Sequence, residues 1–357
     1  MRHLTPPIAR CVTVAALLFL QGCASLGVFV CDAGAPPSSG TEPASGTLSL
    51  VSWNIHALPF DASLDRRLPA IAAELRRRRP DLVLLQEAWL EGDAARVACL
   101  LKPDYDRVPD AWQVYSGVLS LFGHRRGGLL SFVRRSSAWQ LELDRIEPAF
   151  EEYAAAAPRY RLQERDGIAG KGVQSFAVSD GRRRAVMLNT HLQTQYPARG
   201  HRYEDVRMRQ IQQLLAHAGK RMDVDAVVLA GDLNTRADES AHYGALTGVF
   251  RDLTAALRHD CRCGTFITME GTQDMWIDYV FASRKGRGAI DARVELIRNH
   301  GRDNPYSDHH GLWVELDLAS DVDTAAFTPC ADPRLQESGQ FLHCLLQRDT
   351  SAWIVSN

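Results

Sequence analysis

The hydrophobic and polar positions of the chain predict alternating strands and helices between Leu48 and Leu318. The segment LSLVSW, which begins at Leu48, carries the apolar and β-branched residues typical of a strand. In Leu64–Arg79 the apolar residues recur at helical spacing, and Pro80 ends the helix. The same patterns predict a second helix at Glu204–Ala218 and further strands at Asp81–Leu85, Leu129–Val133, Ala185–Leu188, Ala226–Leu229, Trp276–Phe281 and Leu312–Leu318. Many strands with few long helices favour two central sheets with helices outside them.

The N-terminal segment has the organisation of an export signal. Arg2 and Arg10 precede an apolar run, Cys11–Leu20, which is too short to cross a bilayer as a stable helix. The following Leu20-Gln21-Gly22-Cys23 resembles a bacterial lipobox, in which cleavage before the cysteine leaves it free for lipidation. We therefore expect residues 1–22 to be a lipoprotein signal peptide and Cys23 to carry a lipid anchor; an ordinary signal peptide cut nearby is the alternative. The protein would be exported, either as a membrane-anchored lipoprotein of the bacterial envelope or as a secreted protein.

The segments that flank the predicted domain differ from it in composition. Residues 24–47 are rich in Ala, Gly, Pro and Ser, so we expect residues 23–47 to form a flexible tether. Residues 48–318 form the folded domain in this interpretation. Residues 319–357 contain little apolar material and are expected to be a C-terminal extension.

Six cysteines lie beyond the predicted lipidation site, and in an oxidising compartment they could form three disulfides. Cys330 and Cys344 are expected to pair within the C-terminal extension, with Cys31 as a rival partner for either of them. Cys261 and Cys263 resemble half of a zinc site. No second pair of cysteines or histidines stands at a suitable spacing, so structural zinc is not expected.

The charge of the chain bears on its partners. Its formal net charge is −2, which argues against a strong non-specific grip on nucleic acid, where a basic face is expected. Two arginine runs, Arg76–Arg79 and Arg182–Arg184, could be read as basic patches. The first closes a helix and the second follows a turn at Gly181, so we interpret both as solvated surface.

Polar residues able to bind a metal ion follow the first two predicted strands. Asn54 comes after LSLVSW, where an asparagine alone is usually a turn residue. Glu87 closes the apolar run Asp81–Leu85, and a glutamate there is costly to bury unless it is paired or bound to a metal. Each signal is weak by itself.

Three further residues follow strands in the middle of the chain. His191 stands at a strand end, where a lone histidine is more often structural than catalytic. Asp232 and Asn234 are two positions apart, so they can aim at one point, and Gly231 permits a tight turn before them.

The last group consists of Asp278, Asp308 and His309. A carboxylate and a histidine at separate strand ends suit a general base that is held by an orienting acid. Neighbouring residues of an extended segment point in opposite directions, so Asp278 is the better partner for His309, and Asp308 is left to lie nearer a metal.

Together, in this order and spacing, the motifs resemble the endonuclease/exonuclease/phosphatase superfamily over about Leu48–Leu318. The resemblance implies an α/β fold, a four-layer αββα sandwich with two central mixed sheets. It implies a Mg²⁺ site, or one for Mn²⁺ or Co²⁺, and oxygen ligands of this kind suit a hard cation in any case. The implied ligands are Glu87, Asn54 and Asp308, and the implied catalytic residues are His191, Asp232, Asn234, Asp278, Asp308 and His309.

The resemblance also implies how these residues act. Asp232 and Asn234 would hold the attacking water and the phosphate, and His309 would contact one of the two. His191 would donate to the phosphate or protonate the leaving oxygen. Lipid-cleaving members are also described with Asp308 and His309 as a dyad, so the assignment of Asp278 to His309 stays open to that alternative.

The segments around His191 resemble the sphingomyelinases within this superfamily. Three stretches carry the likeness: Gly170-Lys171-Gly172-Val173, Asn189–Gln193 and Arg207–Ile211. The long aromatic hairpin of secreted bacterial sphingomyelinases has no clear counterpart. Its nearest candidate, Val118–Phe122, fits a plain buried segment equally well.

We therefore expect a monomeric, metal-dependent phosphodiesterase that cleaves a phospholipid headgroup at a membrane surface with a metal-activated water. The alternatives are an extracellular nuclease with nucleic acid as its partner, an inositol-type phosphatase, and a non-catalytic envelope lipoprotein that uses the fold for binding. The non-catalytic alternative is disfavoured because every expected polar position is filled.

Overall fold

The computed structural model describes residues 47–110, 123–125, 127–142, 149–152, 170–195, 203–261, 263–267, 274–283, 290–298 and 306–318. The predicted signal peptide and nearly all of the tether lie outside these residues, as do Val118–Phe122 and the C-terminal extension. Cys31, Cys330 and Cys344 are outside them as well, so the disulfide expected in the extension stays a prediction. Within the described residues, no helix is both long enough and apolar enough to cross a bilayer.

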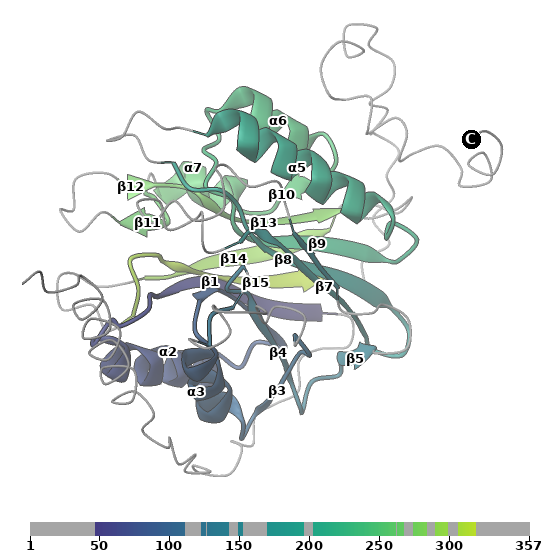
Figure 1. Ribbon diagram of the computed structural model, residues 1–357. Helices are drawn as coiled ribbons and strands as arrows, with labels where there is room; N and C mark the ends of the chain where they lie inside the picture. The colour runs from purple at the N-terminus through teal and green to yellow at the C-terminus, as the bar shows by residue number, and fades with distance from the viewer. Residues whose placement is uncertain are drawn as a thin grey trace, which may run out of the picture.

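Two mixed β-sheets form the centre of the molecule (Figure 1). The first sheet has the strand order β14 (Asp291–Ile297), β15 (Gly311–Asp317), β1 (Thr47–Ala57), β2 (Leu82–Ala88), β4 (Leu130–Arg134) and β3 (Tyr105–Arg107). The second has the order β10 (Arg251–Asp252), β13 (Asp278–Ser283), β9 (Ala226–Asp232), β8 (Arg184–His191), β7 (Gly172–Ser179) and β5 (Gln140–Glu142), and β6 (Ala149–Glu152) also pairs with β7. The pairs β1–β2 and β8–β9 are parallel and the other pairs are antiparallel.

Helices cover the outer face of each sheet. The first sheet is covered by α2 (Leu64–Arg78) and α3 (Glu91–Leu101), and the second by α5 (Glu204–Gly219), α6 (Ser240–Thr247) and α7 (Ala255–Cys261) (Figure 1). A short hairpin of β11 (Phe266–Ile267) and β12 (Asp274–Met275) stands beside the sheets. This arrangement is the predicted four-layer αββα sandwich.

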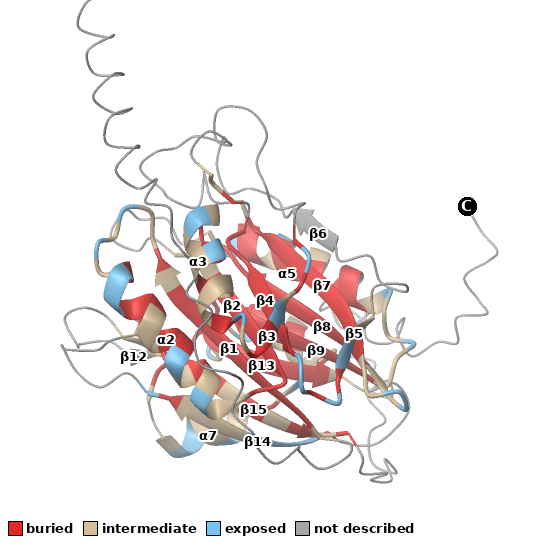
Figure 2. Cartoon of the chain, turned by 90° about the horizontal axis from the view of Figure 1, so that it is seen from below, coloured by how far each residue is buried: buried red, intermediate tan, exposed pale blue. Residues whose placement is uncertain are grey.

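The alternation of side chains along β1 explains the two cores. Leu48 and Leu50 belong to the hydrophobic cluster whose side chains fill the space between the sheets. Val51, Trp53 and Ile55 belong to the cluster beneath α2 and α3. Since successive side chains of a strand point to opposite faces, β1 is apolar on both faces because it is covered on both. Figure 2 shows the central strands buried and the exposed residues on the helices, the turns and edge strands such as β5 and β14.

The predicted strands and both predicted helices are present, with ends that differ by a few residues. The largest difference lies at β1, which continues to Ala57 where the sequence pattern predicted an end at Trp53. The sequence patterns did not predict the helices α3, α6 and α7 or the strands β3, β5, β6, β7, β10, β11, β12 and β14.

A layer of buried amide and hydroxyl side chains joins the two sheets. Gln86 of the first sheet donates from Nε2 to Asn189 Oδ1 of the second (2.8 Å). Asn189 donates from Nδ2 to Ser131 Oγ (3.2 Å), and Ser131 in turn donates to Gln174 Oε1 (2.7 Å). Because buried polar groups are costly without partners, this layer favours one placement of the sheets over others.

Gly231 lies inside β9 and not in the tight turn that the sequence suggested. Its φ is +146°, and an added Cβ would stand 1.9 Å from the carbonyl oxygen of Thr190 on the neighbouring strand. The absence of a side chain therefore lets β9 approach β8 closely. At this point the register places His191 opposite Asp232.

We expect Gly231→Ala to destabilise the protein by more than about 1 kcal/mol, because alanine meets both a backbone contact and an unfavourable φ there. The matched control is Gly244→Ala in α6, where an added Cβ meets nothing within 4 Å. This substitution should stabilise the protein by about 0.5–1 kcal/mol, because alanine favours the helix. Urea unfolding of the two variants and the parent measures both effects. A Gly231→Ala protein as stable as the parent would show that the close approach of β8 and β9 is unimportant.

Candidate active site

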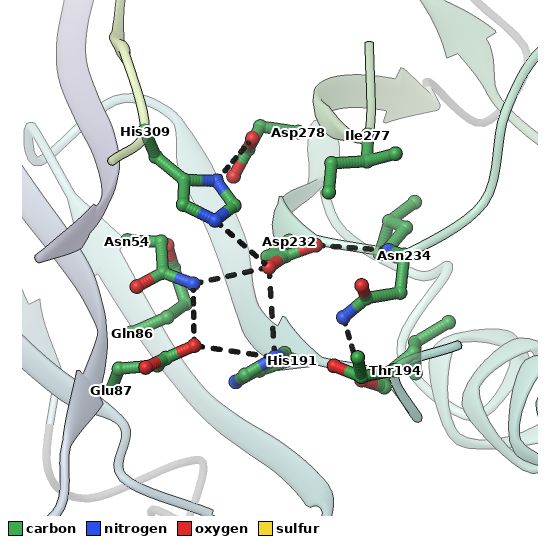
Figure 3. A network of polar contacts seen from close by, with 12 residues as sticks. Asn54, Gln86, Glu87, His191, Thr194, Asp232, Asn234, Ile277, Asp278 and His309 are labelled. Atoms are coloured by element: carbon green, nitrogen blue, oxygen red, sulfur yellow. Dashed lines mark hydrogen bonds and ion pairs between the residues drawn. The ribbon is translucent and has the colours of Figure 1, made fainter. Parts of the chain in front are cut away.

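Side chains from both sheets converge at one end of the sandwich (Figure 3). Asn54 and Glu87 come from β1 and β2 of the first sheet. The second sheet contributes three residues that end or begin its strands: His191, Asp232 and Asp278. Here β9 is the central strand, with His191 and Asp278 each opposite Asp232 in the register.

Asn54 connects the two sheets through its amide. Its Nδ2 donates to Glu87 Oε1 (3.0 Å) and to Asp232 Oδ2 (3.1 Å), while its Oδ1 accepts a hydrogen bond from the backbone N–H of His56 (3.0 Å). The amide therefore presents its nitrogen to the two carboxylates and its oxygen to the backbone. The expected role of Asn54 as a metal ligand stays a prediction.

The backbone at Glu87 directs its carboxylate into the site. Gln86 faces the second sheet, so simple alternation would place Glu87 on the opposite face of β2. Glu87 has a φ of +64°, a left-handed conformation that is uncommon for residues other than glycine, and the β1–β2 register shifts beside it. His56 and Asn234 are also at positive φ. Such strained positions often cluster at functional sites.

His309 is held by Asp278, as the sequence predicted. Its Nδ1 lies 2.8 Å from Asp278 Oδ2, and its Nε2 lies 3.8 Å from Asp232 Oδ2. Burial alone would lower the pKa of His309, but the charge and hydrogen bond of Asp278, with Asp308 and Asp232, raise it well above its ordinary value. The imidazole therefore favours its charged form.

Asp308 lies farther from the centre than the other acids. Its Oδ2 is 3.3 Å from His56 Nδ1, and its Oδ1 is 4.0 Å from His309 Nε2. It is absent from the candidate ligand clusters found among the described residues. Its expected roles as a metal ligand and as a catalytic residue stay predictions.

Asp232 is the most perturbed acid of the site. Burial and the charge of Asp278 raise its pKa to about 7, although His309 and the backbone N–H of Asn234 act in the opposite direction. That N–H donates to Asp232 Oδ1 (2.9 Å), and Asn234 Nδ2 donates to the carbonyl of Leu192 (3.0 Å). The backbone of Asn234 thus contacts Asp232, and the expected convergence of their two side chains on one point stays a prediction.

Lys171 lies in the site, although the sequence patterns assigned it no catalytic role. Its Nζ lies 3.1 Å from His191 Nε2 and 5.7 Å from the ring centroid of Trp89, and its side chain is buried. Burial, then the charges of Lys171 and His309, lower the pKa of His191 well below its ordinary value. The Gly170-Lys171-Gly172-Val173 motif carries the sequence signal for this residue, but by itself it indicates only a likeness to the sphingomyelinases.

The site has the donors that a divalent cation needs. Glu87, His191 and Asp232 each offer an atom, and these atoms all lie within 4.8 Å of one another. The Nε2 of His191 is near the Lys171 ammonium, so the two carboxylates are the better donors, and carboxylate oxygens suit Mg²⁺. Clustered carboxylates repel one another unless a cation is present; the charges of Asp278 and, to a smaller extent, Glu87 add to burial in raising the pKa of Asp232.

Other motifs of the sequence serve the structure around the site. Arg207 donates to Glu239 Oε2 (2.8 Å), and Gln210 Oε1 accepts a hydrogen bond from the backbone of Gln193 (2.8 Å), which holds the segment after His191. The arginine runs form ion pairs with nearby acids: Arg76 with Asp104, Arg77 and Arg78 with Glu74, Arg183 with Asp180, and Arg184 with Glu142.

We expect Glu87→Gln to weaken Mg²⁺ binding at least about tenfold, or about 1.4 kcal/mol, because it removes one of the two clustered charges. Calorimetric titration measures the affinity, and the melting temperature in excess EDTA should not fall, since the repulsion with Asp232 is relieved. Glu204→Gln, at an exposed position of α5, is the control. Unchanged affinity in Glu87→Gln would place the metal elsewhere.

Comparisons with known proteins identify the family of the chain. The model of the Endonuclease/Exonuclease/phosphatase family matches residues 51–309. A Drosophila melanogaster protein, "Putative neutral sphingomyelinase", is 25% identical over 260 residues, which are 72% of this chain and 53% of that protein. The chain thus spans about half the length of this curated relative.

Solved structures share the fold. A humanized D. rerio TDP2 has a TM-score of 0.58 and 20% identity, covering 76% of this chain and 99% of that one. An endonuclease/exonuclease/phosphatase from Bacteroides vulgatus has a TM-score of 0.56 and 16% identity, with coverage of 76% and 99%. A mannosyl-6-phosphatase from Bacteroides thetaiotaomicron has a TM-score of 0.53 and 17% identity, with coverage of 75% and 99%. Because the family model matches most of the chain, from β1 through His309, the chain belongs to the endonuclease/exonuclease/phosphatase family of metal-dependent phosphoric ester hydrolases.

Proposed function

We propose that the protein is a sphingomyelinase-like phosphodiesterase that cleaves the headgroup of a phospholipid. The observation that carries the proposal is the pairing of Lys171 with His191 beside the Glu87 and Asp232 carboxylates. Both residues lie in segments that resemble the sphingomyelinases. The Drosophila relative, described as a neutral sphingomyelinase, supports the same substrate class.

In this proposal three groups bind the phosphate of the substrate. The charged imidazole of His309 and the ammonium of Lys171 attract the anionic ester from two sides. His191 is neutral, because burial and Lys171 lower its pKa, so it acts as a hydrogen-bonding partner and not as a cation. Asn234 holds the Asp232 carboxylate in place through its backbone N–H.

Asp232 is the group best suited to take a proton from the attacking water. Its Oδ2 lies at the centre of the site, 3.6 Å from His191 Nε2 and 3.8 Å from His309 Nε2, whereas the charged His309, expected to help in this step, already holds its proton. A Mg²⁺ ion held by Glu87 and Asp232 would supply a Lewis acid that stabilises charge on the phosphate oxygens. Asp278 keeps His309 oriented toward the substrate.

A nuclease is the second candidate function. One solved structure of this fold is D. rerio TDP2 complexed with a single-strand DNA product, at 18% identity and a TM-score of 0.57. Five of the seven arginines in the two runs that could serve a nucleic acid form ion pairs with the chain's own acids. We therefore rank this candidate below the lipid substrate, together with an inositol-type phosphatase.

We also propose that the protein is exported and anchored through a lipid on Cys23, on the strength of the Leu20-Gln21-Gly22-Cys23 motif. An anchor of this kind would hold the domain near lipid surfaces. Mass spectrometry of the mature N-terminus tests it. A mature chain that begins anywhere other than Cys23 would contradict the proposal.

The substrate class can be tested with the full chain and Mg²⁺ in parallel assays. The substrates are sphingomyelin vesicles, phosphatidylcholine vesicles, plasmid DNA and an inositol polyphosphate, and Asp232→Asn is the inactive control. We expect release of the phosphorylated headgroup from at least one type of vesicle. Hydrolysis of DNA or of the inositol phosphate with intact vesicles would favour those alternatives, and no turnover of any substrate would favour a binding lipoprotein.

Lys171→Met should lower kcat/KM by about 10- to 100-fold, because a hydrogen bond to a charged phosphate contributes roughly 1.5–3 kcal/mol. Lys171→Arg keeps the charge and should retain part of the activity. Lys220→Met, at an exposed position after α5, is the matched control and should behave as the parent. Steady-state kinetics on the best vesicle substrate measures these effects. Parent-like kinetics in Lys171→Met would remove Lys171 from the phosphate site.

A further inference from the structure

A short segment outside the family motifs connects both members of the Asp278–His309 pair. This segment, residues 263–267, leads from the end of α7 into β11, and we name it the strap. We propose that the strap positions Asp278 and His309 for catalysis, and that the disulfide between Cys261 and Cys263 holds the strap in place. The inference depends on hydrolysis at this site but not on which phosphodiester is the natural substrate.

Thr265 of the strap holds the backbone of Asp278. Its side chain is fully buried, and its Oγ1 accepts hydrogen bonds from the backbone N–H groups of Ile277 (3.1 Å) and Asp278 (3.0 Å). Its own N–H donates to the carbonyl of Met275 (2.9 Å). The hydroxyl therefore fixes the first residue of β13, from which the Asp278 carboxylate reaches His309.

The strap also holds the chain on both sides of His309. The N–H of Ile267 donates to the carbonyl of Asp308 (2.9 Å), and the N–H of His310 donates to the carbonyl of Thr265 (2.7 Å). Between these two bonds, the ring of Phe266 lies 5.0 Å from the imidazole of His309, centroid to centroid, at 57°. One face of the imidazole is thus covered by an aromatic ring.

These contacts make one segment common to both partners. The Nδ1–Oδ2 distance of 2.8 Å between His309 and Asp278 depends on two chain segments that are 31 positions apart, and the strap is bonded to both. Catalytic groups lose rate steeply when they are misplaced by about 1 Å. A displaced strap should therefore lower turnover more than it lowers stability.

The disulfide stands where the strap begins. Cys261 is the last residue of α7, Cys263 is the first residue of the strap, and their bond encloses a single residue. Both cysteines are half-buried and pack at the edge of the core. The bond thus ties the strap to a helix. The sequence pattern of Cys261 and Cys263 resembles half of a zinc site, but in the structure the two cysteines form a disulfide with each other.

A dithiol reductant can open this bond. The dithiol donates two electrons and two protons, Cys261 and Cys263 become thiols, and the reductant becomes its own cyclic disulfide. The strap would then be held only by its hydrogen bonds and by the packing of Phe266. We expect the site to lose order before the fold does.

The first test separates positioning from folding with matched variants. Thr265→Val removes the hydroxyl and keeps the shape, whereas Thr265→Ser keeps the hydroxyl. With Mg²⁺ and bis(4-nitrophenyl) phosphate, Thr265→Val should lower kcat at least about tenfold with KM nearly unchanged, and Thr265→Ser should restore most of it. The proposal would be overturned if Thr265→Val lowered the melting temperature but left kcat per folded molecule at the parent value.

The second test addresses the disulfide and does not require turnover. The downfield imidazole Nδ1 proton of His309, assigned by its loss in His309→Ala, should broaden or shift in dithiothreitol, and kcat should fall. The variant with both Cys261→Ala and Cys263→Ala should show the reduced behaviour with or without dithiothreitol, which separates this bond from other disulfides. An unchanged proton signal on reduction would overturn the role of the disulfide. If the enzyme does not turn over the substrate but the His309 proton signal still shifts on reduction, the choice of substrate is wrong and the role of the strap stands.

Discussion

The placement of one sheet on the other is the constraint on which the site depends. The buried layer of Gln86, Asn189 and Ser131 holds the sheets together with hydrogen bonds that have no replacement in an apolar core. Only with this placement does a carboxylate of the first sheet, Glu87, meet Asp232 of the second through the amide of Asn54. The catalytic chemistry is thus a property of the interface between the sheets and not of either sheet alone.

Electrostatic balance explains how so many charges are tolerated in a buried site. Burial and the charge of Asp278, with a smaller contribution from Glu87, raise the pKa of Asp232, while His309 becomes charged because Asp278 and the other acids surround it. Lys171 adds a second cation beside His191. The site therefore offers cationic groups for an anionic ester and carboxylates for a divalent cation. The same balance accounts for the neutral state of His191.

Sequence patterns predicted the sandwich and the side chains that converge in it, because strand periodicity and the polar residues at strand ends are local features. They did not reveal α3, which begins at Glu91 without a side-chain cap and contains Gly92 near its start. They also missed the left-handed backbone of Glu87, the close approach at Gly231 and the contact of Lys171 with His191. Each of these depends on how distant segments pack, which no local pattern encodes.

The coupling between the carboxylates and the cation is tested most directly by Mg²⁺ titration calorimetry in two buffers of different ionisation enthalpy. Below a pKa of about 7 Asp232 holds a proton, and binding of the cation should expel it. We expect proton release at pH 6.5, little release at pH 8.5, tighter binding as the pH rises through 7, and no such release in Asp232→Asn. Equal heats in both buffers at pH 6.5, with Mg²⁺ bound, would contradict the account.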